Sequence, residues 1–585
     1  MKPKSQNPLA PSRISNLALR TSLALFATAL AADAATFTWD GGGLDNNATN
    51  GVNWAGDAAP AAGQVLVFSG TSAIGTAINW DLTNGNNPTS LTFDASSLAY
   101  TLSGANLIQL TTAGTVLTNN SAATITINNT VNVFYNNTKT FAANTGTLAL
   151  GTVQFRGDTL TTGQTNTLAL SGSSNGSIAL INRNGTFATG ATEALTKSGT
   201  GTWTLSGANS YQGLTTISAG TLKLGGAGSG ANSPLGTVGT GTTITGGTLD
   251  LNGFTLSTAE ALTLSGTGVS SGGALSNSSA TAATFSGLVT LGANASIVSN
   301  LANTTGNILL SNAGTITGAG FGLTLGGTTT GNSIASIIGT TTGGITKNNS
   351  GTWTLSGVNT YTGTTTVANG TLVLSGNRTV ASGAITVAGA GAAPTLNIQN
   401  GTFTLGGSFV IGQSASTSVV NHSAGAITAT GGQQVLLGNG DSTATYNLSG
   451  GSLTGGIRMG VNAATTANVN IFNLSGTGTL TSSSLQIGRS DAAGSYKTTN
   501  TFSQTAGTAT ITSLSIGGAT GDAAVVSNIS GTLNLTGGTF TATNFTSLSA
   551  GGANTSAITI GGTAVVTLPA FPTSRAVSPV AMGTG

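Results

Sequence analysis

The sequence predicts an all-β protein, a right-handed parallel β-helix (β-solenoid) with an N-terminal β capping region. Three observations lead to this expectation. Glutamate, a good helix former, occurs only at Glu193 and Glu260 in 585 residues. Glycine is abundant, with 90 residues, while proline is limited to 10 and no collagen-like G-X-Y period is present. Internal repeats separated by glycine turns indicate stacked coils rather than one globular core.

The composition excludes several functional classes. The chain has no cysteine and one histidine, His422, which excludes disulfide scaffolds, thiolate metal sites and His-rich metal sites. Only 5% of the residues are charged. Nucleic-acid binding needs many Lys and Arg side chains for the phosphate backbone, so we do not expect it. Hydrophobic residues reach 38%, which argues against intrinsic disorder at such low net charge.

Residues 1–34 have the three parts of a signal peptide. Four basic residues and no acid occupy the first 20 positions, an apolar run covers 22–30, and Ala32-Asp33-Ala34 offers an Ala-x-Ala cleavage site. The alternative is an uncleaved N-terminal anchor. Removing this segment takes away four of the 15 basic and one of the 13 acidic residues and leaves a net charge of −1. No other segment approaches the ~18 apolar residues of a membrane-spanning helix, so we expect an exported mature chain without a transmembrane span.

Residues 35–115 differ in composition from the rest of the chain. We expect them to form an N-terminal β region that caps the first coil, because the open end of a stack of strands invites edge-to-edge pairing. This region is rich in aromatic and acidic side chains. It holds three of the five tryptophans and five acids, namely Trp39, Trp54, Trp80, Asp40, Asp45, Asp57, Asp81 and Asp94.

A duplicated unit lies within the solenoid expected over residues 116–405. Residues 195–225 and 345–375 align without a gap, and 18 of the 31 positions are identical. Large aromatic residues align as well, which shared Gly and Thr richness would not produce. Duplication of this kind is typical of solenoids and arrays. The aligned aromatic residues are Trp203 with Trp353 and Tyr211 with Tyr361.

Period-2 alternation identifies the strands of this unit. Trp353 and Leu355 share one face, and hydroxyl side chains share the other. Lys223 is expected on the outer face between two inward leucines. Asn209 and Asn359 lie in the turn before the tyrosine, where a short amide is expected to bond local backbone. Glycines at matching positions are expected to supply turn geometry that a Cβ forbids; they are Gly201, Gly207, Gly213 and Gly220, with Gly351, Gly357, Gly363 and Gly370 in the second copy.

A second, shorter repeat fills residues 406–570. Its unit is Asn-x-Ser, or a near variant, followed within two residues by Gly, and successive units begin 26, 26, 30 and 25 residues apart. A short apolar strand ending in Gly lies between the units. A period in the twenties with short strands and glycine turns corresponds to one coil of a parallel β-solenoid. The units begin at Asn421, Asn447, Asn473, Ser503 and Asn528.

The coils are expected to be stable only when stacked. One coil buries too little apolar area to fold, whereas stacking joins the inner side chains into one core and brings repeated Thr and Asn into ladders. At roughly 22–25 residues a coil, the mature chain would form about 20–25 coils. Their spacing gives a rod on the order of 100 Å long. Residues 571–585 break the pattern and are expected to be irregular, as at a truncated end.

The duplicated unit resembles the autotransporter-associated β-strand repeat, also called the passenger-associated transport repeat. The residues that carry the resemblance run from Lys197 to Leu222 and from Lys347 to Leu372. The opening segment 36–54 is similar to the start of many exported bacterial proteins with these repeats. The resemblance implies a β-helical passenger that crosses the outer membrane of a Gram-negative-type cell and is displayed or released. It also implies that the repeats assist secretion.

Three local motifs raise the question of catalysis or ligand binding. Residues 172–176 match the G-x-S-x-G nucleophile elbow, but the only histidine available as a base is His422, in a slot filled elsewhere by apolar residues or Gln. The stretch 225–230 imitates a phosphate loop without the lysine and helix that such a loop needs, so we expect a turn. Asp40 and Asp45 resemble a Ca²⁺-binding turn, which in true binding arrays is repeated.

Two further sets of side chains are candidate sites. Trp203 and Trp353 can in principle stack on sugar rings, but their phase favours burial in the core. Asp250 and Glu260 can lie on adjacent coils and so form the carboxyl pair of a polysaccharide-cleaving β-helix. Lys223 is the only basic residue near them in the sequence.

The sequence therefore predicts a non-enzymatic, exported β-solenoid that serves as a structural scaffold or adhesin at the cell surface or in the medium. No catalytic, cofactor-binding or metal-binding residue is assigned, and no cofactor is expected. Surface glycans, other cells and the outer-membrane export machinery are the expected partners. The first alternative is a glycan-binding module in the Trp-rich N-terminal region, with Trp54 as the residue to test. The second is a polysaccharide-degrading β-helix enzyme.

Overall fold

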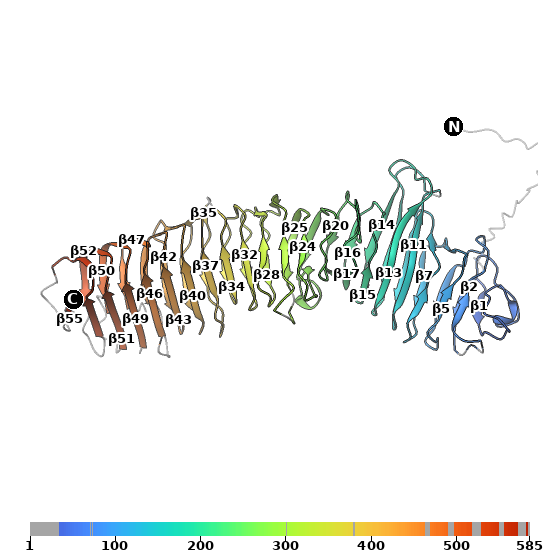
Figure 1. Ribbon diagram of the computed structural model, residues 1–585, viewed down its shortest axis with the longest axis horizontal. Helices are drawn as coiled ribbons and strands as arrows, with labels where there is room; N and C mark the ends of the chain where they lie inside the picture. Colours follow the sequence, from blue (N-terminus) through green and yellow to red (C-terminus); the bar gives the residue numbers. More distant parts are fainter. Residues whose placement is uncertain are drawn as a thin grey trace, which may run out of the picture.

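The computed structural model describes residues 34–582, apart from 71, 73, 159, 300, 303, 378–380, 462–467, 489–496, 518–527, 549–554 and 571–580. The chain is an elongated rod of parallel strands wound into about 19 turns, with about 1% helix (Figure 1). The predicted fold class, an all-β parallel β-solenoid, is confirmed. The predicted signal peptide and C-terminal irregular segment lie outside the described residues, except for Ala34 and residues 581–582.

One ladder of parallel strands runs along almost the whole rod. It continues without a break past residue 115, the end of the predicted capping region, because β4 pairs with β7 and β7 with β10. Its strands are β1 (Thr36–Trp39), β2 (Val65–Phe68), β4 (Ser90–Phe93), β7 (Gly114–Asn119), β10 (Thr138–Ala143), β12 (Thr165–Ser171), β14 (Thr192–Lys197), β16 (Thr215–Ile217), β20 (Thr242–Ile244), β22 (Leu262–Gly266), β25 (Val289–Val298), β28 (Leu323–Gly326), β31 (Ile345–Lys347), β33 (Thr365–Val367), β36 (Ile385–Val387), β39 (Phe409–Gln413), β42 (Gln434–Asn439), β45 (Gly456–Val461), β48 (Leu485–Ile487), β50 (Thr508–Ile516) and β52 (Thr539–Leu548).

A second wall of the tube is built from two ladders, of which the N-terminal one joins the main ladder where its last strand pairs with Ile297 and Val298 of β25. The first serves the N-terminal half and comprises β3 (Ala77–Asn79), β5 (Thr101–Ser103), β8 (Ile125–Ile127), β11 (Leu148–Arg156), β13 (Gly176–Asn184), β15 (Thr202–Leu205), β17 (Thr221–Leu224), β21 (Thr248–Asp250) and β23 (Leu275–Ser276). The second serves the C-terminal half and comprises β24 (Ala283–Phe285), β26 (Ile308–Leu310), β29 (Asn332–Ile334), β32 (Thr352–Leu355), β34 (Thr371–Leu374), β37 (Thr395–Ile398), β40 (Thr417–His422), β43 (Thr443–Leu448), β46 (Asn468–Leu474), β49 (Lys497–Gln504), β51 (Asn528–Leu535) and β53 (Thr555–Ile560).

Shorter elements complete the coils. A third C-terminal ladder comprises β35 (Ala381–Ser382), β38 (Thr402–Leu405), β41 (Ala426–Ala429), β44 (Ser452–Thr454) and β47 (Thr479–Ser482), and it joins β50. The other described elements are β6 (Ile108–Leu110), β9 (Val131–Val133), β18 (Asn232–Ser233), β19 (Gly236–Thr237), β27 (Thr315–Ile316), β30 (Ile337–Ile338), β54 (Val565–Thr567), β55 (Ala581–Met582) and the single helical turns η1 (Gly51–Asn53) and η2 (Val269–Ser271).

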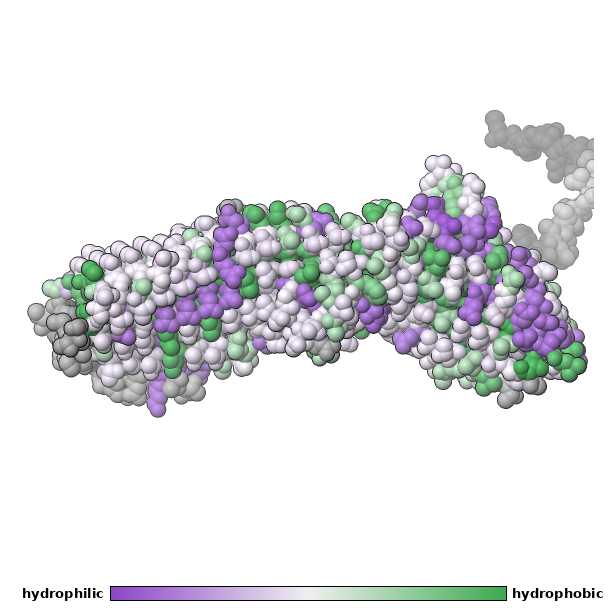
Figure 2. Space-filling view, viewed as in Figure 1, coloured by the Kyte–Doolittle hydropathy of each residue, from purple (hydrophilic) through white to green (hydrophobic). Residues whose placement is uncertain are grey.

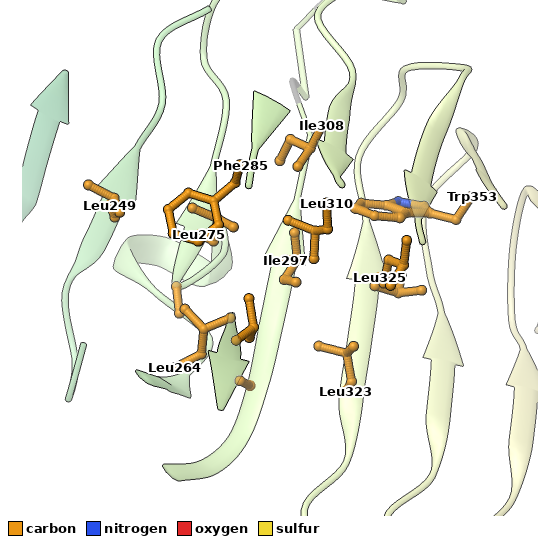
Figure 3. Close-up of a cluster of buried hydrophobic side chains, with 14 of the residues drawn as sticks. Leu249, Leu264, Leu275, Phe285, Ile297, Ile308, Leu310, Leu323, Leu325 and Trp353 are labelled. Carbon is orange, nitrogen blue, oxygen red and sulfur yellow. The ribbon is translucent and has the colours of Figure 1, made fainter. Parts of the chain in front are cut away.

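The core is one continuous file of apolar side chains inside the tube. In β16, for example, Thr215 and Ile217 are buried while Thr216 between them lies on the outer face. Repeating this alternation along the ladders stacks Leu, Ile, Val and aromatic side chains from coil to coil. Figure 3 shows part of this file, from Leu249 to Trp353. The apolar surface that stabilises each coil is thus supplied by its neighbours.

The tube has about 19 turns rather than the 20–25 expected from a minimal coil length. Several coils are longer than the minimum because they carry excursions, such as the antiparallel hairpin β18–β19 and the helical turn η2. At ~4.8 Å between coils, about 19 turns give a rod about 90 Å long. The outer surface is mostly of intermediate hydropathy, with hydrophilic patches at the N-terminal end and in a band across the C-terminal half (Figure 2).

An asparagine ladder follows the outer face of the C-terminal repeats. Each Nδ2 donates to the Oδ1 of the preceding coil, from Asn421 to Asn397 at 2.9 Å, from Asn447 to Asn421 at 2.8 Å and from Asn473 to Asn447 at 2.8 Å. The predicted repeat spacing is confirmed at these positions.

The fifth unit of this repeat was placed wrongly. Asn473 pairs with Ser503 as predicted, but Ser503 then pairs with Asn534, whereas Asn528 pairs with Lys497. A short sequence match selected the wrong asparagine, because the number of residues between successive strands is larger here than in the earlier coils. Stacking in register, rather than the local Asn-x-Ser pattern, decides which residues are equivalent.

Candidate functional site

The duplicated unit buries a lysine inside the tube. Lys197 ends β14 and has no exposed surface; its ammonium donates to the carbonyl of Gly199 in its own turn and to that of Ala219 in the next coil, the latter at 3.1 Å. Desolvation lowers the pKa of the Lys197 ammonium to about 8, and it does the same for Lys347. Each lysine therefore ties the turns of two adjacent coils together. The acceptors of Lys347 are the carbonyls of Asn348 at 2.6 Å, Asn349 at 2.7 Å and Asn369 at 3.1 Å.

Burial of these lysines follows from the alternation of inward and outward residues along a strand. The sequence analysis did not predict it. In β14 the buried positions are Glu193, Leu195 and Lys197, two residues apart each time. In β10, Lys139 has the same parity as buried Phe141 and is also fully buried. Its ammonium donates to the Phe134 carbonyl and to Asn137 Oδ1, and desolvation lowers the pKa of Lys139 to about 8.

Both tryptophans of the duplicated unit are core residues, as their phase predicts. Trp203 and Trp353 have no exposed surface. Their indole Nε1 groups donate to backbone carbonyls of the preceding coil, at 3.0 Å for Ser171 and 2.9 Å for Gly326. Gly176 faces Trp203 across the ladder, and a Cβ there would overlap the indole ring. The packing of each tryptophan thus depends on the coil before it.

Asn209 bonds to two other coils. Its Oδ1 accepts from Ile181 N at 2.7 Å in the preceding coil, and its Nδ2 donates to Pro234 O at 2.7 Å in the following one. The expectation that this amide bonds local backbone is therefore wrong, since the turn is packed between two neighbouring coils. Asn359 repeats the first of these bonds, accepting from Ile338 N at 2.8 Å.

The tyrosine hydroxyls also form the same contact in both copies. The hydroxyl of Tyr211 lies 2.8 Å from Thr215 Oγ1, and that of Tyr361 lies 2.8 Å from Thr365 Oγ1.

The glycines of the unit serve two different purposes. Gly220 and Gly370 have φ values of +62° and +66°, a left-handed conformation that favours glycine. A Cβ at either position would also press against the buried lysine ammonium. Gly201 has an ordinary φ, and a Cβ there would overlap the carbonyl of Ser174 in the preceding coil. Close approach of coils, rather than turn geometry, therefore requires glycine at this position.

The G-x-S-x-G match and the histidine do not form a catalytic pair. Ser174 lies in a turn that joins strands β12 and β13, and β13 and β40 lie in different halves of the rod (Figure 1). His422, in β40, is fully buried, with its ring nitrogens 2.9 Å from Tyr446 Oη and 3.3 Å from Gly425 O. Burial lowers the pKa of its imidazole. His422 pairs in register with Leu448, so it fills an apolar slot of the core.

Asp250 and Glu260 each have their own partners. Asp250, at the end of β21, accepts from Ser278 N at 2.9 Å and Ser278 Oγ at 2.6 Å, and its carboxylate lies 3.8 Å from Lys223 Nζ. Glu260 precedes β22, and its Oε1 accepts from Thr242 Oγ1 at 3.2 Å. Among the described residues, the two carboxyl groups share no hydrogen-bond partner: Ser278 donates to Asp250 and Thr242 donates to Glu260.

Burial raises the pKa of two carboxyl groups inside the tube. Glu260 is 1% exposed, and its Oε2 has no hydrogen-bond partner within the described chain. Desolvation raises the pKa of Glu260 to about 7. Desolvation also raises the pKa of Glu193, although Arg183 at 3.0 Å opposes the shift. Perturbed acids often mark active sites, but these shifts arise from packing in the wall of the tube.

The remaining motifs are turns. The stretch 225–230 leads from β17 into the hairpin β18–β19 and is not followed by a helix. Asp45 accepts from Asn50 Nδ2 at 3.0 Å and Asn47 N at 3.1 Å, and these bonds, chiefly that from Asn50, lower the pKa of its carboxyl group.

Across the described ranges, no group of three or more His, Asp or Glu side chains is placed to hold a metal ion. In the same ranges, no helix combines the length and apolar character needed to cross a membrane.

The N-terminal tryptophans close the end of the tube. Trp39, Trp54 and Trp80 have no exposed surface. Trp39 and Trp54 meet edge to face with ring centroids 5.2 Å apart, and Trp54 Nε1 donates to Ala48 O at 2.8 Å. This packing lies at the N-terminal tip of the rod (Figure 1), where β1 pairs with β2 on one side and Trp39 forms an antiparallel bridge with Trp54. None of the five tryptophans offers a ring face on which a sugar can stack.

Comparison with known proteins identifies the duplicated unit. Residues 195–224 and 345–374 match the family model of the passenger-associated transport repeat. The resemblance inferred from the sequence is therefore confirmed at both copies, with boundaries within one residue. No curated protein and no solved structure matches the chain.

Proposed function

We propose that the protein is an exported, non-enzymatic rod of the passenger type, displayed at the cell surface or released, where it serves as a scaffold or adhesin. The two passenger-associated transport repeats support the export part of this proposal. The signal-peptide pattern of residues 1–34 supports it independently. The continuous core supports the scaffold part, because the large side chains inside it hold coils together.

The observation that carries the proposal is the way in which repeat side chains connect neighbouring coils. Trp203 bonds to the coil before it, Lys197 to the coil after it, and Asn209 to both. A passenger that leaves a membrane unfolded must begin to stack somewhere, and a coil with specific bonds on both sides is a favourable place. The repeats would thus assist secretion by fixing the first coils of the stack.

Export is tested with the full chain expressed in a bacterium that has an outer membrane. Intact cells are labelled with an antibody against the rod, and the medium is analysed by immunoblotting. We expect signal at the surface or in the medium for the full chain, and retention inside the cell for a variant that lacks residues 1–34. Retention of the full chain, or export of the truncated variant, contradicts the proposal.

The two alternatives find less support. A polysaccharide-degrading activity needs converging carboxyl groups, and Asp250 and Glu260 have separate partners. A glycan site built on Trp54 and its neighbours needs exposed rings, and these rings are buried. Turnover of a polysaccharide by the purified protein, abolished by Asp250→Asn, would overturn the non-enzymatic part of the proposal.

A further inference from the structure

A groove runs along the rod beside the second passenger-associated transport repeat. Its volume is about 560 Å³, a size typical of ligand sites. It is bounded at one end by the turn η2, which Figure 3 shows beside the strands that carry Leu264 and Leu275. Hydroxyl, amide and small side chains form the lining, without a charged side chain or an aromatic ring. Its polar residues include Thr267, Ser271, Thr324, Asn348, Asn349 and Asn369.

The groove follows the axis of the rod. Its lining residues come from β25, β28 and the turns after β31, β33 and β36, which pair in that order in one ladder. Five successive coils at ~4.8 Å span about 20 Å. This axial groove therefore fits an extended chain better than a compact small molecule.

The asparagines in the axial groove distinguish the second repeat from the first. In the first copy the lysine donates to the backbone carbonyls of Gly199 and Ala219, and in the second copy to those of Asn349 and Asn369. Because these bonds use the backbone alone, holding the lysine does not require asparagine side chains. At Gly199 of the first copy, a Cβ would overlap the backbone of Gly172. The three replacements, all in the lining, are Ser198 by Asn348, Gly199 by Asn349 and Ala219 by Asn369.

The amides are oriented by their backbone partners. Asn349 Oδ1 accepts from Gly327 N at 3.0 Å, and Asn369 Oδ1 accepts from Gly370 N at 2.7 Å. Because the oxygen end of each amide is fixed, the Nδ2 end is available as a donor to a ligand. Asn349 and Ser271 also have φ values of 58° and 60°, a conformation that costs free energy in residues other than glycine and that concentrates at functional sites.

We propose that the axial groove binds a neutral, linear glycan lying along the rod. Sugar hydroxyls donate and accept hydrogen bonds, as do the hydroxyl and amide groups of the lining. An acidic glycan would call for Arg or Lys in the lining; the nearby Lys347 faces the interior, where three carbonyls accept from its ammonium. This proposal goes beyond the proposed function and does not depend on it, because a rod can be exported without a ligand.

The test compares the purified protein without residues 1–34 with two variants. The triple variant N348S/N349G/N369A gives the second repeat the residues of the first, and glycine at position 349 accommodates the left-handed φ of 58° found there. Ala390→Trp fills the axial groove from an exposed position. The probes are fluorescently labelled cellohexaose, xylohexaose and maltohexaose, with hexagalacturonate as the acidic comparison, and binding is measured by fluorescence anisotropy. Gly239→Ala, at a glycine with open space around it, is the control variant.

We expect at least one neutral hexasaccharide to bind the unmodified protein and the Gly239→Ala control. Binding should weaken about tenfold or more in the triple variant, the size of effect expected when several hydrogen bonds are lost. Circular dichroism checks that each variant keeps its fold. Failure of all three neutral sugars to bind, equal binding by the triple variant, or binding of hexagalacturonate alone would overturn the proposal. The export assay is independent of these outcomes, so failure of one proposal is distinguishable from failure of the other.

Discussion

At the scale of single residues, small and large side chains in adjacent coils are matched to one another. Gly176 leaves the space that the Trp203 ring occupies in the next coil. Gly220 leaves space for the Lys197 ammonium to reach backbone carbonyls. Glycine is therefore abundant in this chain partly because coils approach closely, and partly because some turns need a left-handed conformation.

Gly176→Ala is expected to destabilise the rod. The added Cβ overlaps the Trp203 ring, and overpacking of this kind costs about 1–3 kcal/mol. Thermal unfolding followed by near-UV circular dichroism should show a lower midpoint. Gly239→Ala is the matched control, because a Cβ there meets nothing within 4 Å. Equal midpoints for the two variants would contradict the packing described here.

Glu260→Gln is expected to stabilise the rod increasingly as the pH rises above about 4.5, with the full effect above pH 7. Burial raises the pKa of Glu260 from 4.5 to about 7, so the folded state binds a proton that the unfolded state releases at lower pH. The associated stability is present below pH 4.5 and is lost as the pH rises through about 7. Thermal unfolding at pH 8.5 should show a higher midpoint for the variant, and at pH 4.5 the two proteins should agree. A difference that does not change with pH would contradict this assignment.

The alternation of inward and outward positions along a strand predicts much of the interior, and it holds even for charged residues that the sequence analysis did not place. The inward phase of Trp203 and Trp353 was predicted correctly. The same parity places Glu193 and Lys197 inside, yet a buried charge costs so much free energy that an outer position is the usual expectation. Carbonyl groups of the next coil satisfy the Lys197 ammonium, and one sequence in isolation does not show that those groups are there.

At the scale of the elements, register is fixed by side chains that repeat from coil to coil. The outer asparagine ladder runs through β37, β40, β43 and β46 with Nδ2 to Oδ1 distances of 2.8–2.9 Å. On the inner face of β43, β46 and β49, the rings of Tyr446 and Phe472 stack with centroids 5.0 Å apart, and those of Phe472 and Phe502 stack at 5.2 Å. A slip of one residue would exchange the two faces and break both ladders.

Asn447→Ala is expected to loosen the middle of the asparagine ladder. The change removes two hydrogen bonds of 2.8 Å, and each lost bond costs about 0.5–1.5 kcal/mol. Amide hydrogen exchange in β43 and its neighbours β40 and β46 should accelerate. Thr445→Ala, on the outer face of the same strand, serves as the control. Unchanged exchange in the Asn447 variant would show that the ladder does not hold the register.

The order of the strands could be predicted from spacing, but not every equivalence between them. Asn421, Asn447 and Asn473 were placed correctly because their coils have equal length. Asn528 was confused with Asn534, since spacing along the chain counts residues in excursions as well as those in the coil. The axial groove was beyond prediction from the sequence, because it depends on how η2 and turns from several coils come together.

At the scale of the whole molecule, the rod is stabilised by neighbouring coils rather than by a central globular core. The ladder from β1 to β52 connects the N-terminal tip to the last coils without a break (Figure 1). A single coil of this size buries too little apolar area to stay folded alone, so stability grows with each coil added. The two passenger-associated transport repeats contribute coils with bonds in both directions along this axis.

Small-angle X-ray scattering of the purified protein without residues 1–34 tests this arrangement most directly. The account predicts an asymmetric distribution of interatomic distances that extends to about 90 Å or beyond, as a rod of about 19 coils requires. A symmetric distribution with a radius of gyration near the ~24 Å of a compact globule of this length would contradict it.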